Sequence, residues 1–364
     1  MKTIQASAFE GLTRLLQESL EEGNEHAIRA ELMRFTAQLR VAERREDFLP
    51  YLFAAALMKR LDPAASDQMN LYLKQFDVPQ ITLFNLLAEK FPLMNGVTAA
   101  ANALLSRFVR PGEPLRFLEI GIGTGRQIVM LLNQLAEQGR SPASLVLHAV
   151  EPNDCTLREA EHHLKEAAGR LGLPLEFHAH PAEIERLPDQ VWATVENGPG
   201  RLLVNASFAL HHIRDHEPGR SAKDAILHRI RRLQPAVLVL CEPDSDHHTS
   251  DAVQRFVSCW NHFQAVFRFI DSPPLQPEES RALKSFFGRE IEDIIAGRES
   301  LRCERHESTD SWKARARQAG FIPGAVAEAA PHLKPHPEMT VSAGGWHLGF
   351  GHSGINLVSV ICTM

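Results

Sequence analysis

One stretch constrains the fold of this chain more than any other. An apolar run at residues 115–120 ends in the glycine-spaced segment Gly121-Ile-Gly-Thr-Gly125, and a helix-like segment follows at residues 127–135. A strand, a glycine-rich turn and a helix in this order let a ligand approach bare backbone beside the free N–H groups of a helix N-terminus. The stretch therefore predicts a nucleotide-type cofactor site at the end of a buried strand.

The spacing of the glycines indicates which cofactor. A dinucleotide fingerprint, GxGxxG, needs its last glycine where this chain has Arg126. Here the third glycine comes one residue earlier, and an acidic residue, Glu119, precedes the loop. This E-x-G-x-G-x-G pattern resembles the first motif of the methyltransferases that use S-adenosylmethionine (SAM). The resemblance implies SAM as the cofactor.

The chain changes character near residue 110. Residues 1–110 carry apolar side chains at three- and four-residue spacing without a strand pattern, so we expect an all-helical cap. This cap either supports the sheet or closes over a substrate. Residues 111–364 alternate apolar strands with amphipathic helices, which predicts a mainly parallel core sheet. Long helices at about 250–270 and 277–296 interrupt the alternation and form a helical insertion at about 250–297.

The expected fold is α/β: a Rossmann-like, seven-stranded sheet of the SAM-methyltransferase type with a helical cap and inserted helices. The final stretch suits the antiparallel strand that closes such a sheet. The strands that the sequence marks are at residues 115–120, 144–151, 175–180, 201–207, 236–241 and 354–363.

Composition excludes several classes of protein. The net charge of −6 argues against a broad nucleic-acid surface and therefore against a DNA-binding regulator. The five cysteines are scattered without a CxxC pair, as in a reduced cytoplasmic protein. A signal peptide is not apparent, and no apolar run approaches the ~20 residues of a membrane span. We expect a cytoplasmic protein with no nucleic-acid or membrane partner, and a homodimer is left open.

A SAM site also needs a carboxylate for the ribose and a slot for the adenine. Glu151, at the end of the second strand, can accept both ribose hydroxyls. The segment ending in Ala182 stands where the adenine edge is contacted, although the usual residue there is acidic. Asn205 and Ser207 either contact the cofactor or only finish the fourth strand. The full expected cofactor set is Glu119, Gly121, Gly123, Gly125, Glu151, Pro152, Asn153, Ala182, Asn205 and Ser207.

Methyl transfer to a hydroxyl or amine requires alignment and removal of a proton. His212 and Glu242 stand just beyond strands, and His306 lies in a Glu-Arg-His-Glu box, so these three are the expected catalytic residues. The string Asp244-Ser-Asp-His-His248 has metal-ligand residue types. A polar loop after the fifth strand explains that string better, and we expect no metal site.

Several further segments are similar to the GRAS-domain family, which has a SAM-methyltransferase-like fold and is known mostly from plants, with bacterial relatives. The similarity spans most of the chain, and the most specific part is Glu304-Arg-His-Glu307 followed by Trp312, Arg315 and Ala319-Gly-Phe321. The other similar segments are residues 97–105, 204–212, 238–243 and 255–267.

Plant members of that family act as transcriptional regulators and are poor in the loop glycines, whereas this chain keeps them. The resemblance to the GRAS-domain family, together with the intact glycine loop, implies that this chain is similar to a bacterial, enzyme-like branch of that family. We therefore expect a SAM-dependent methyltransferase of GRAS type that acts on a small-molecule oxygen or nitrogen nucleophile. The alternative is a non-catalytic GRAS-like regulator that binds a small ligand or a protein.

Overall fold

The computed structural model describes residues 4–21, 23–61, 86–87, 90–215, 221–272, 275–327, 329, 333 and 335–364. The chain forms two compact units, each built from separate stretches of sequence. The helical unit comprises Met1–Pro92, Ser245–His306 and His352–Leu357. The sheet unit comprises Leu93–Asp244, Glu307–Gly351 and Val358–Met364. Residues 62–85 of the expected cap lie outside the described residues.

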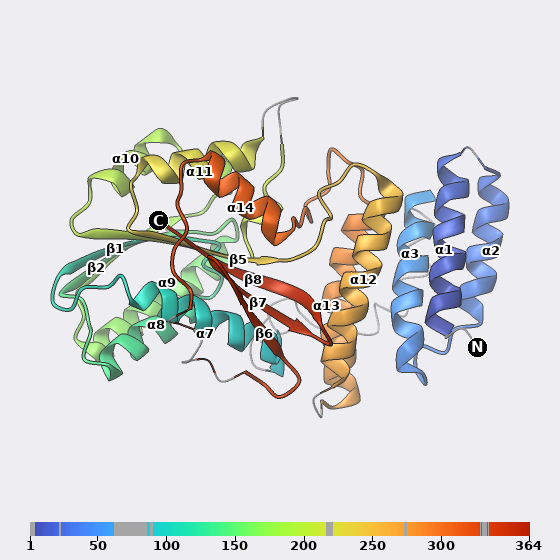
Figure 1. The fold of residues 1–364 in the computed structure, drawn as a ribbon, viewed down its shortest axis with the longest axis horizontal. Helices are drawn as coiled ribbons and strands as arrows, with labels where there is room; N and C mark the ends of the chain where they lie inside the picture. Colours follow the sequence, from blue (N-terminus) through green and yellow to red (C-terminus); the bar gives the residue numbers. More distant parts are fainter. Residues whose placement is uncertain are drawn as a thin grey trace. The chain divides into compact units, whose positions relative to one another are not determined.

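Helices from both ends of the helical unit's sequence pack side by side in a bundle (Figure 1). Helix α3 is apolar on all sides and buried along most of its length, and it packs against α13. Gly288 of α13 faces Leu52 so closely that a Cβ there would lie 3.0 Å from a Leu52 methyl group. The helices are α1 (Ile4–Leu20), α2 (Glu25–Ala37), α3 (Phe48–Leu61), α12 (Ala252–Asp271) and α13 (Pro277–Ala296), with the short η1 (Arg45–Asp47).

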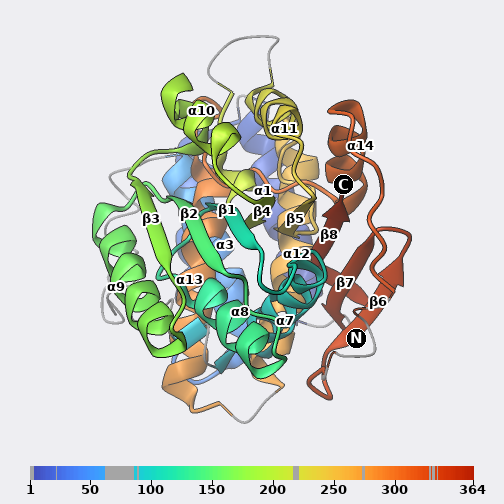
Figure 2. The ribbon, with the colours of Figure 1, turned by 90° about the vertical axis from the view of Figure 1, so that its left-hand side faces the viewer.

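The sheet unit has a mixed sheet of eight strands among the described residues, in the order β3-β2-β1-β4-β5-β8-β7-β6 (Figure 2). The five strands from β3 to β5 are mutually parallel, β8 is antiparallel to β5, and β6 is antiparallel to β7. The strands are β1 (Pro114–Ile120), β2 (Ser144–Val150), β3 (Leu175–His180), β4 (Arg201–Ser207), β5 (Val237–Pro243), β6 (Thr340–Gly344), β7 (His347–His352) and β8 (Ile355–Thr363).

The expected closing antiparallel strand is confirmed as β8, but the expected count of seven strands is wrong. The six strand segments marked in the sequence do not include β6 and β7, which extend the sheet beyond β8. Their sequence contains five glycines between residues 344 and 354, and glycine is unfavourable in strands. Cross-strand pairing therefore decides the conformation of this segment, and local propensity does not reveal it.

Helices cover both faces of the sheet, as expected for an α/β unit. In Figure 1, α10 (Asp189–Asn197), α11 (Ala222–Arg232) and α14 (Thr309–Gln318) lie on one face. The other face carries α7 (Pro92–Ser106), α8 (Arg126–Glu137) and α9 (Asp154–Leu171). In the part of the chain that the structure describes, no helix is long and apolar enough to cross a membrane.

Candidate functional site

The glycine loop joins β1 to α8, and its glycines are required by the backbone. Gly121, Gly123 and Gly125 have φ of 75°, 53° and 77°, in the left-handed region that L residues rarely adopt. A Cβ on Gly121 would lie 2.7 Å from the Cβ of Ala209, and one on Gly125 would lie 3.3 Å from Ala160. These glycines therefore serve close packing inside the unit, whatever the loop binds.

The end of β2 holds this loop in place. The N–H groups of Gly121 and Ile122 donate to the Val150 carbonyl, at 2.8 and 3.2 Å. The Glu151 carboxylate accepts from Gly123 N through Oε2 at 3.2 Å and from Asn153 N through Oε1 at 3.0 Å. Glu151 thus links the glycine loop to the turn between β2 and α9. Its oxygens can still accept further hydrogen bonds from a ligand.

A buried polar cluster lies where β1 and β4 end. Asn205 Nδ2 donates to Glu119 Oε1 at 2.7 Å and lies 3.2 Å from Ser207 Oγ, which in turn donates to Gln127 Oε1 at 2.8 Å. Glu119 is 2% exposed and Asn205 is fully buried. Burial raises the pKa of Glu119 well above its usual range, although the hydrogen bond from Asn205 opposes this. Burial therefore favours the protonated, neutral form of Glu119.

The same cluster has polar atoms without hydrogen-bond partners. They are Glu119 Oε2, Asn205 Oδ1 and Gln127 Nε2, and all three atoms are buried. A buried polar atom left unpaired costs about 1–3 kcal/mol. Three such atoms in one hydrogen-bonded cluster mark a place that suits a polar ligand group.

The remaining expected cofactor residues lie around the second and third crossovers. The Asn153 side chain accepts from Thr156 N at 3.0 Å and so caps α9. Pro152 is exposed, and Ala182 packs against the apolar core beneath α10 and α11. The structure gathers Glu119, Asn205 and Ser207 in one cluster and places Pro152, Asn153 and Ala182 outside it. Gln127 was missed, because a polar residue in the first turn of an amphipathic helix gives no distinctive signal.

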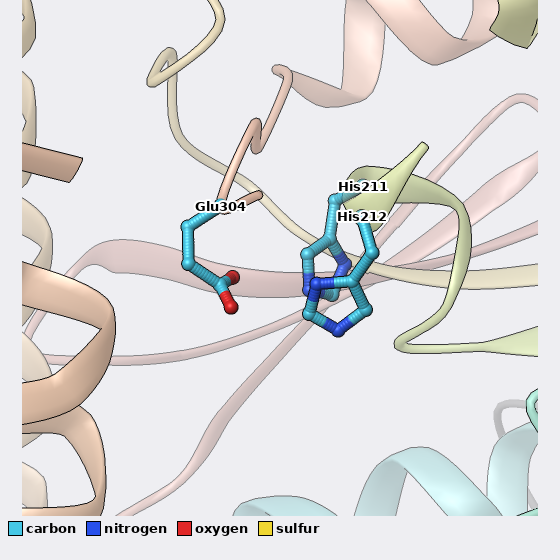
Figure 3. Close-up of side chains that lie close together, drawn as sticks. All are labelled: His211, His212 and Glu304. Atoms are coloured by element: carbon cyan, nitrogen blue, oxygen red, sulfur yellow. The ribbon is translucent and has the colours of Figure 1, made fainter. Parts of the chain in front are cut away.

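The second candidate region lies beyond β4 and β5. Glu242 is 1% exposed, and its oxygens accept from Leu210 N at 2.9 Å and face His211 Nδ1 at 2.6 Å. Figure 3 shows the adjacent rings of His211 and His212, whose centroids are 3.9 Å apart. His211 is buried, and His212, the residue expected from sequence, is exposed. The carboxylate of Glu242 therefore pairs with the neighbour of the expected histidine.

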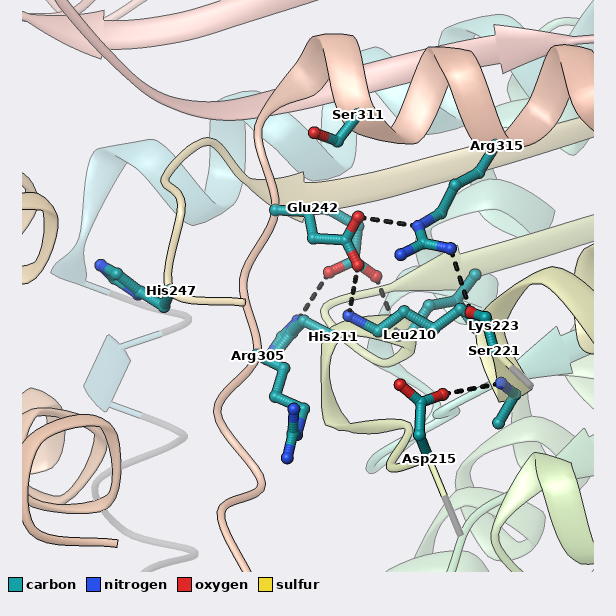
Figure 4. A network of polar contacts seen from close by, with 12 residues as sticks. Leu210, His211, Asp215, Ser221, Lys223, Glu242, His247, Arg305, Ser311 and Arg315 are labelled. Carbon is teal, nitrogen blue, oxygen red and sulfur yellow. Dashed lines mark hydrogen bonds and ion pairs between the residues drawn. The ribbon is translucent and has the colours of Figure 1, made fainter. Parts of the chain in front are cut away.

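A buried ionic network continues from this pair (Figure 4). Lys223 Nζ donates to Glu307 Oε1 at 2.8 Å, and Arg315 Nε donates to Glu307 Oε2 at 2.7 Å. Burial raises the pKa of Glu307, but Lys223 and Arg315 outweigh it and hold that pKa below its usual value. The network joins α11, α14 and the residues just before α14, which is a structural arrangement. Lys223 was missed, because a lone lysine in an amphipathic helix suggests an exposed side chain.

The third expected catalytic residue, His306, belongs to the helical unit. Its Nε2 lies 3.1 Å from Glu304 Oε2, and its Nδ1 lies 2.9 Å from His247 Nδ1. In the string that has metal-ligand residue types, Asp244 Oδ1 accepts from Thr309 N at 2.7 Å and Asp246 Oδ1 accepts from Thr249 N at 3.3 Å. Asp244 thus joins the segment after β5 to the start of α14, and Asp246 holds a local turn.

The sheet unit is that of a Rossmann-like α/β protein with a glycine loop at its first crossover. Residues 13–332 match the GRAS domain family, and the chain belongs to that family. It is similar to Scarecrow-like protein 1 of Arabidopsis thaliana, with 26% identity over 254 residues, 67% of this chain and 42% of the relative. Scarecrow-like transcription factor PAT1 of the same plant is 25% identical over 255 residues, 67% of this chain and 51% of the relative.

The solved structure of SCL7 from Oryza sativa has the same fold, with a TM-score of 0.76, 20% identity and complete coverage of both chains. The chain spans about half the length of the curated relatives it matches, at 42% and 51% for the two named above.

These relatives overturn the expected activity. The expectation of a SAM-dependent O- or N-methyltransferase is wrong, because the similar proteins are plant GRAS regulators and one is named a transcription factor. The expected partner, a small-molecule substrate, is wrong for the same reason. The error has a physical cause. Gly121 and Gly125 are needed for close packing against Ala209 and Ala160, so the presence of these glycines does not demonstrate that a reaction takes place. The catalytic roles expected for His212, Glu242 and His306 were tied to that activity and are not proposed further.

Proposed function

We propose that this protein is a non-catalytic GRAS regulator that binds a small adenosyl ligand at the glycine loop. The ligand is SAM or S-adenosylhomocysteine, and it acts as a bound signal whose methyl group is not transferred. Membership of a family whose named relatives are regulators supports the non-catalytic role. The cluster of unpartnered buried atoms at Glu119, Asn205 and Gln127 carries the ligand part of the proposal.

The chemistry of the cluster suits the amino-acid end of such a ligand. The unpartnered Asn205 Oδ1 is an acceptor for an ammonium group, and Gln127 Nε2 is a donor for a carboxylate. Glu119 adds a buried carboxyl group that gains a proton or an ammonium partner. These residues would hold the zwitterionic end of the ligand, and Glu151 would take the ribose hydroxyls.

The same features favour an adenosyl ligand over a dinucleotide. The N–H groups of Gly121, Ile122 and Gly123 already donate to Val150 and Glu151, so the loop offers few donors to a pyrophosphate. A ligand without phosphates needs fewer donors there. We include the cytoplasmic location in the proposal, because the five cysteines are free thiols.

Isothermal titration calorimetry of the full chain with SAM and with S-adenosylhomocysteine tests the proposal. We expect micromolar binding, about −8 kcal/mol. The change Glu151→Ala removes a charged acceptor, so binding should weaken about 10- to 100-fold, equivalent to 1.5–3 kcal/mol. Glu137→Ala, at an exposed position on α8, is the control and should bind like the wild type.

Two outcomes would contradict the proposal in different ways. Absence of binding by either compound rejects the ligand, whereas release of S-adenosylhomocysteine from SAM with a methylated acceptor rejects the non-catalytic role. Binding that is unaffected by Glu151→Ala places the ligand elsewhere.

A further inference from the structure

The helical unit contains a second cluster of ligand-type side chains, separate from the glycine loop. Glu290 comes from α13, and Glu304 and His306 come from the segment that follows this helix. Their nearest ligand atoms all lie within 4.8 Å of one another. His306 Nε2 is 3.1 Å from Glu304 Oε2 and 4.0 Å from Glu290 Oε2. Neither carboxylate is freely exposed, with 19% exposure for Glu290 and 14% for Glu304.

The distances suit a divalent cation. Zinc binds imidazole nitrogen and carboxylate oxygen at about 2.0–2.2 Å, which places neighbouring ligand atoms roughly 3–3.5 Å apart. The pair His306 Nε2 and Glu304 Oε2 already has this spacing. Glu290 Oε2 needs to approach by less than about 1 Å, within the reach of a side-chain torsion.

His306 is oriented for coordination by a second histidine. Its Nδ1 lies 2.9 Å from Nδ1 of His247, and Nε2 of His247 lies 2.9 Å from Ser245 Oγ. If His306 Nδ1–H donates to His247 Nδ1, and His247 Nε2–H donates to Ser245 Oγ, both nitrogens of His247 and Nδ1 of His306 have a hydrogen-bond partner. The lone pair of His306 Nε2 then faces the two carboxylates. A second hydrogen bond that fixes the tautomer is the usual arrangement of a metal-binding histidine.

The segment that carries Glu304 and His306 is fixed before any ion binds. Asp293 Oδ2, one turn after Glu290 in α13, accepts from Cys303 N at 2.8 Å and from Glu304 N at 2.7 Å. The fully buried Arg302 donates to the carbonyls of His247 and Glu304, at 2.7 and 2.9 Å. The His247 N–H donates to the His306 carbonyl at 2.9 Å. Preorganised ligands reduce the cost of binding.

Electrostatics also favours a cation at this position. Two carboxylates and a lone pair that converge in a mostly buried place repel one another. Arg302 and Arg305 of this segment both pair with Glu299, at 2.9 and 3.0 Å. A divalent ion neutralises both carboxylates at once.

We propose that Glu290, Glu304 and His306 form a binding site for a divalent transition-metal ion, with His247 positioning His306. One imidazole and two carboxylates suit Zn²⁺ first and Mn²⁺ second. The ion fastens the segment after α13 to that helix and leaves room for an exogenous ligand in the coordination sphere. This site is independent of the adenosyl ligand proposed above.

Titration of the chelator-treated full-length protein with Zn²⁺ tests the site, with a competing chromophoric chelator to resolve affinity. We expect one tight equivalent per chain, followed by weaker binding from the 18 histidines of the chain. Glu290→Gln and His306→Gln should each abolish the tight equivalent. His247→Asn should weaken it about 10- to 100-fold, as removal of an outer-shell partner does.

Matched controls separate the site from surface binding. Glu278→Gln, on the exposed face of the same helix, and His26→Asn, at an exposed position of α2, should keep the tight equivalent. Replacement of Zn²⁺ by Co²⁺ provides a second readout on the wild type, since nitrogen and oxygen ligands in a four-coordinate site give visible absorption bands. Circular dichroism confirms that each variant is folded.

The result that overturns the proposal is a wild-type protein without a tight equivalent and without Co²⁺ bands. Tight binding that persists in folded Glu290→Gln and His306→Gln variants overturns it equally, because the ion then lies elsewhere.

Discussion

Replacing Glu119 by glutamine should change how the stability of the protein depends on pH. Glu119 is buried at the end of β1, and its pKa lies well above the ordinary value of 4.5. The folded protein therefore holds this proton to a higher pH than the unfolded chain does. Because the folded state binds the extra proton, this group makes stability fall as pH rises above about 4.5.

The size of the effect on the free energy of unfolding depends on how far the folded pKa of Glu119 lies above its unfolded pKa. Holding one proton costs about 1.36 kcal/mol for each pH unit above the unfolded pKa. The total effect therefore grows with the distance between the unfolded and the folded pKa of Glu119. Glutamine keeps the oxygen that accepts from Asn205 Nδ2 but does not titrate. The stability of Glu119→Gln relative to the wild type should therefore rise as pH rises above 4.5, by up to about 1.4 kcal/mol per pH unit.

Urea unfolding at several pH values, followed by tryptophan fluorescence, measures this difference. Trp192, Trp312 and Trp346 lie in the core of the sheet unit and report on it. A difference in unfolding free energy that is the same at every pH reflects the new amide group. The test is therefore the slope of the unfolding free energy against pH. Exposed Glu137→Gln is the control and should follow the wild-type slope. Equal slopes for Glu119→Gln and the wild type would show that Glu119 is ionised in the folded state.

Three further outcomes are expected. Gly121→Ala should destabilise the sheet unit by about 2 kcal/mol or more in the same unfolding assay, because φ is 75° and the new methyl group meets Ala209; a loss below 0.5 kcal/mol would contradict the packing role. Lys223→Met should cost about 3–5 kcal/mol, since it removes a buried cation that pairs with the buried Glu307; a stability equal to the wild type would mean that the pair is dispensable. If the ammonium group of the adenosyl ligand lies against Glu119, binding at pH 7 should release up to one proton, so the binding enthalpy should differ between phosphate and Tris buffers in the wild type and agree in Glu119→Gln; equal enthalpies in the wild type would place the ammonium elsewhere.

Much of the sheet could be predicted because its central strands are continuous apolar runs. Strands β1, β4 and β5 are buried on both faces between helical layers, and this environment requires such runs. The glycine loop was equally visible, since φ values near +75° restrict the sequence. Strands β6 and β7 could not be found in the same way, because their glycine-rich sequence is ordered by pairing alone.

The candidate sites were predictable by residue type but not by partner. In a short 3-10 turn such as η3 (Leu210–His212), adjacent side chains point in different directions. Which of His211 and His212 pairs with Glu242 therefore becomes clear only from the three-dimensional structure. The cluster of Glu290 with His306 joins residues from a helix and from the irregular segment that follows it, and no spacing rule connects them. The error about activity has another origin: a motif specifies the shape of a loop, and similar shapes occur in proteins that catalyse no reaction.

The division of the chain between its two units has a practical consequence. The sequence passes from one unit to the other after residues 92, 244, 306, 351 and 357. A truncation that removes the first 92 residues therefore deletes α3 and strips α13 of a packing partner that meets it at Gly288. Deletion fragments of this protein should aggregate even when the sheet unit is intact. Dissecting the roles of the units requires point substitutions or rejoined segments, because no single cut separates them.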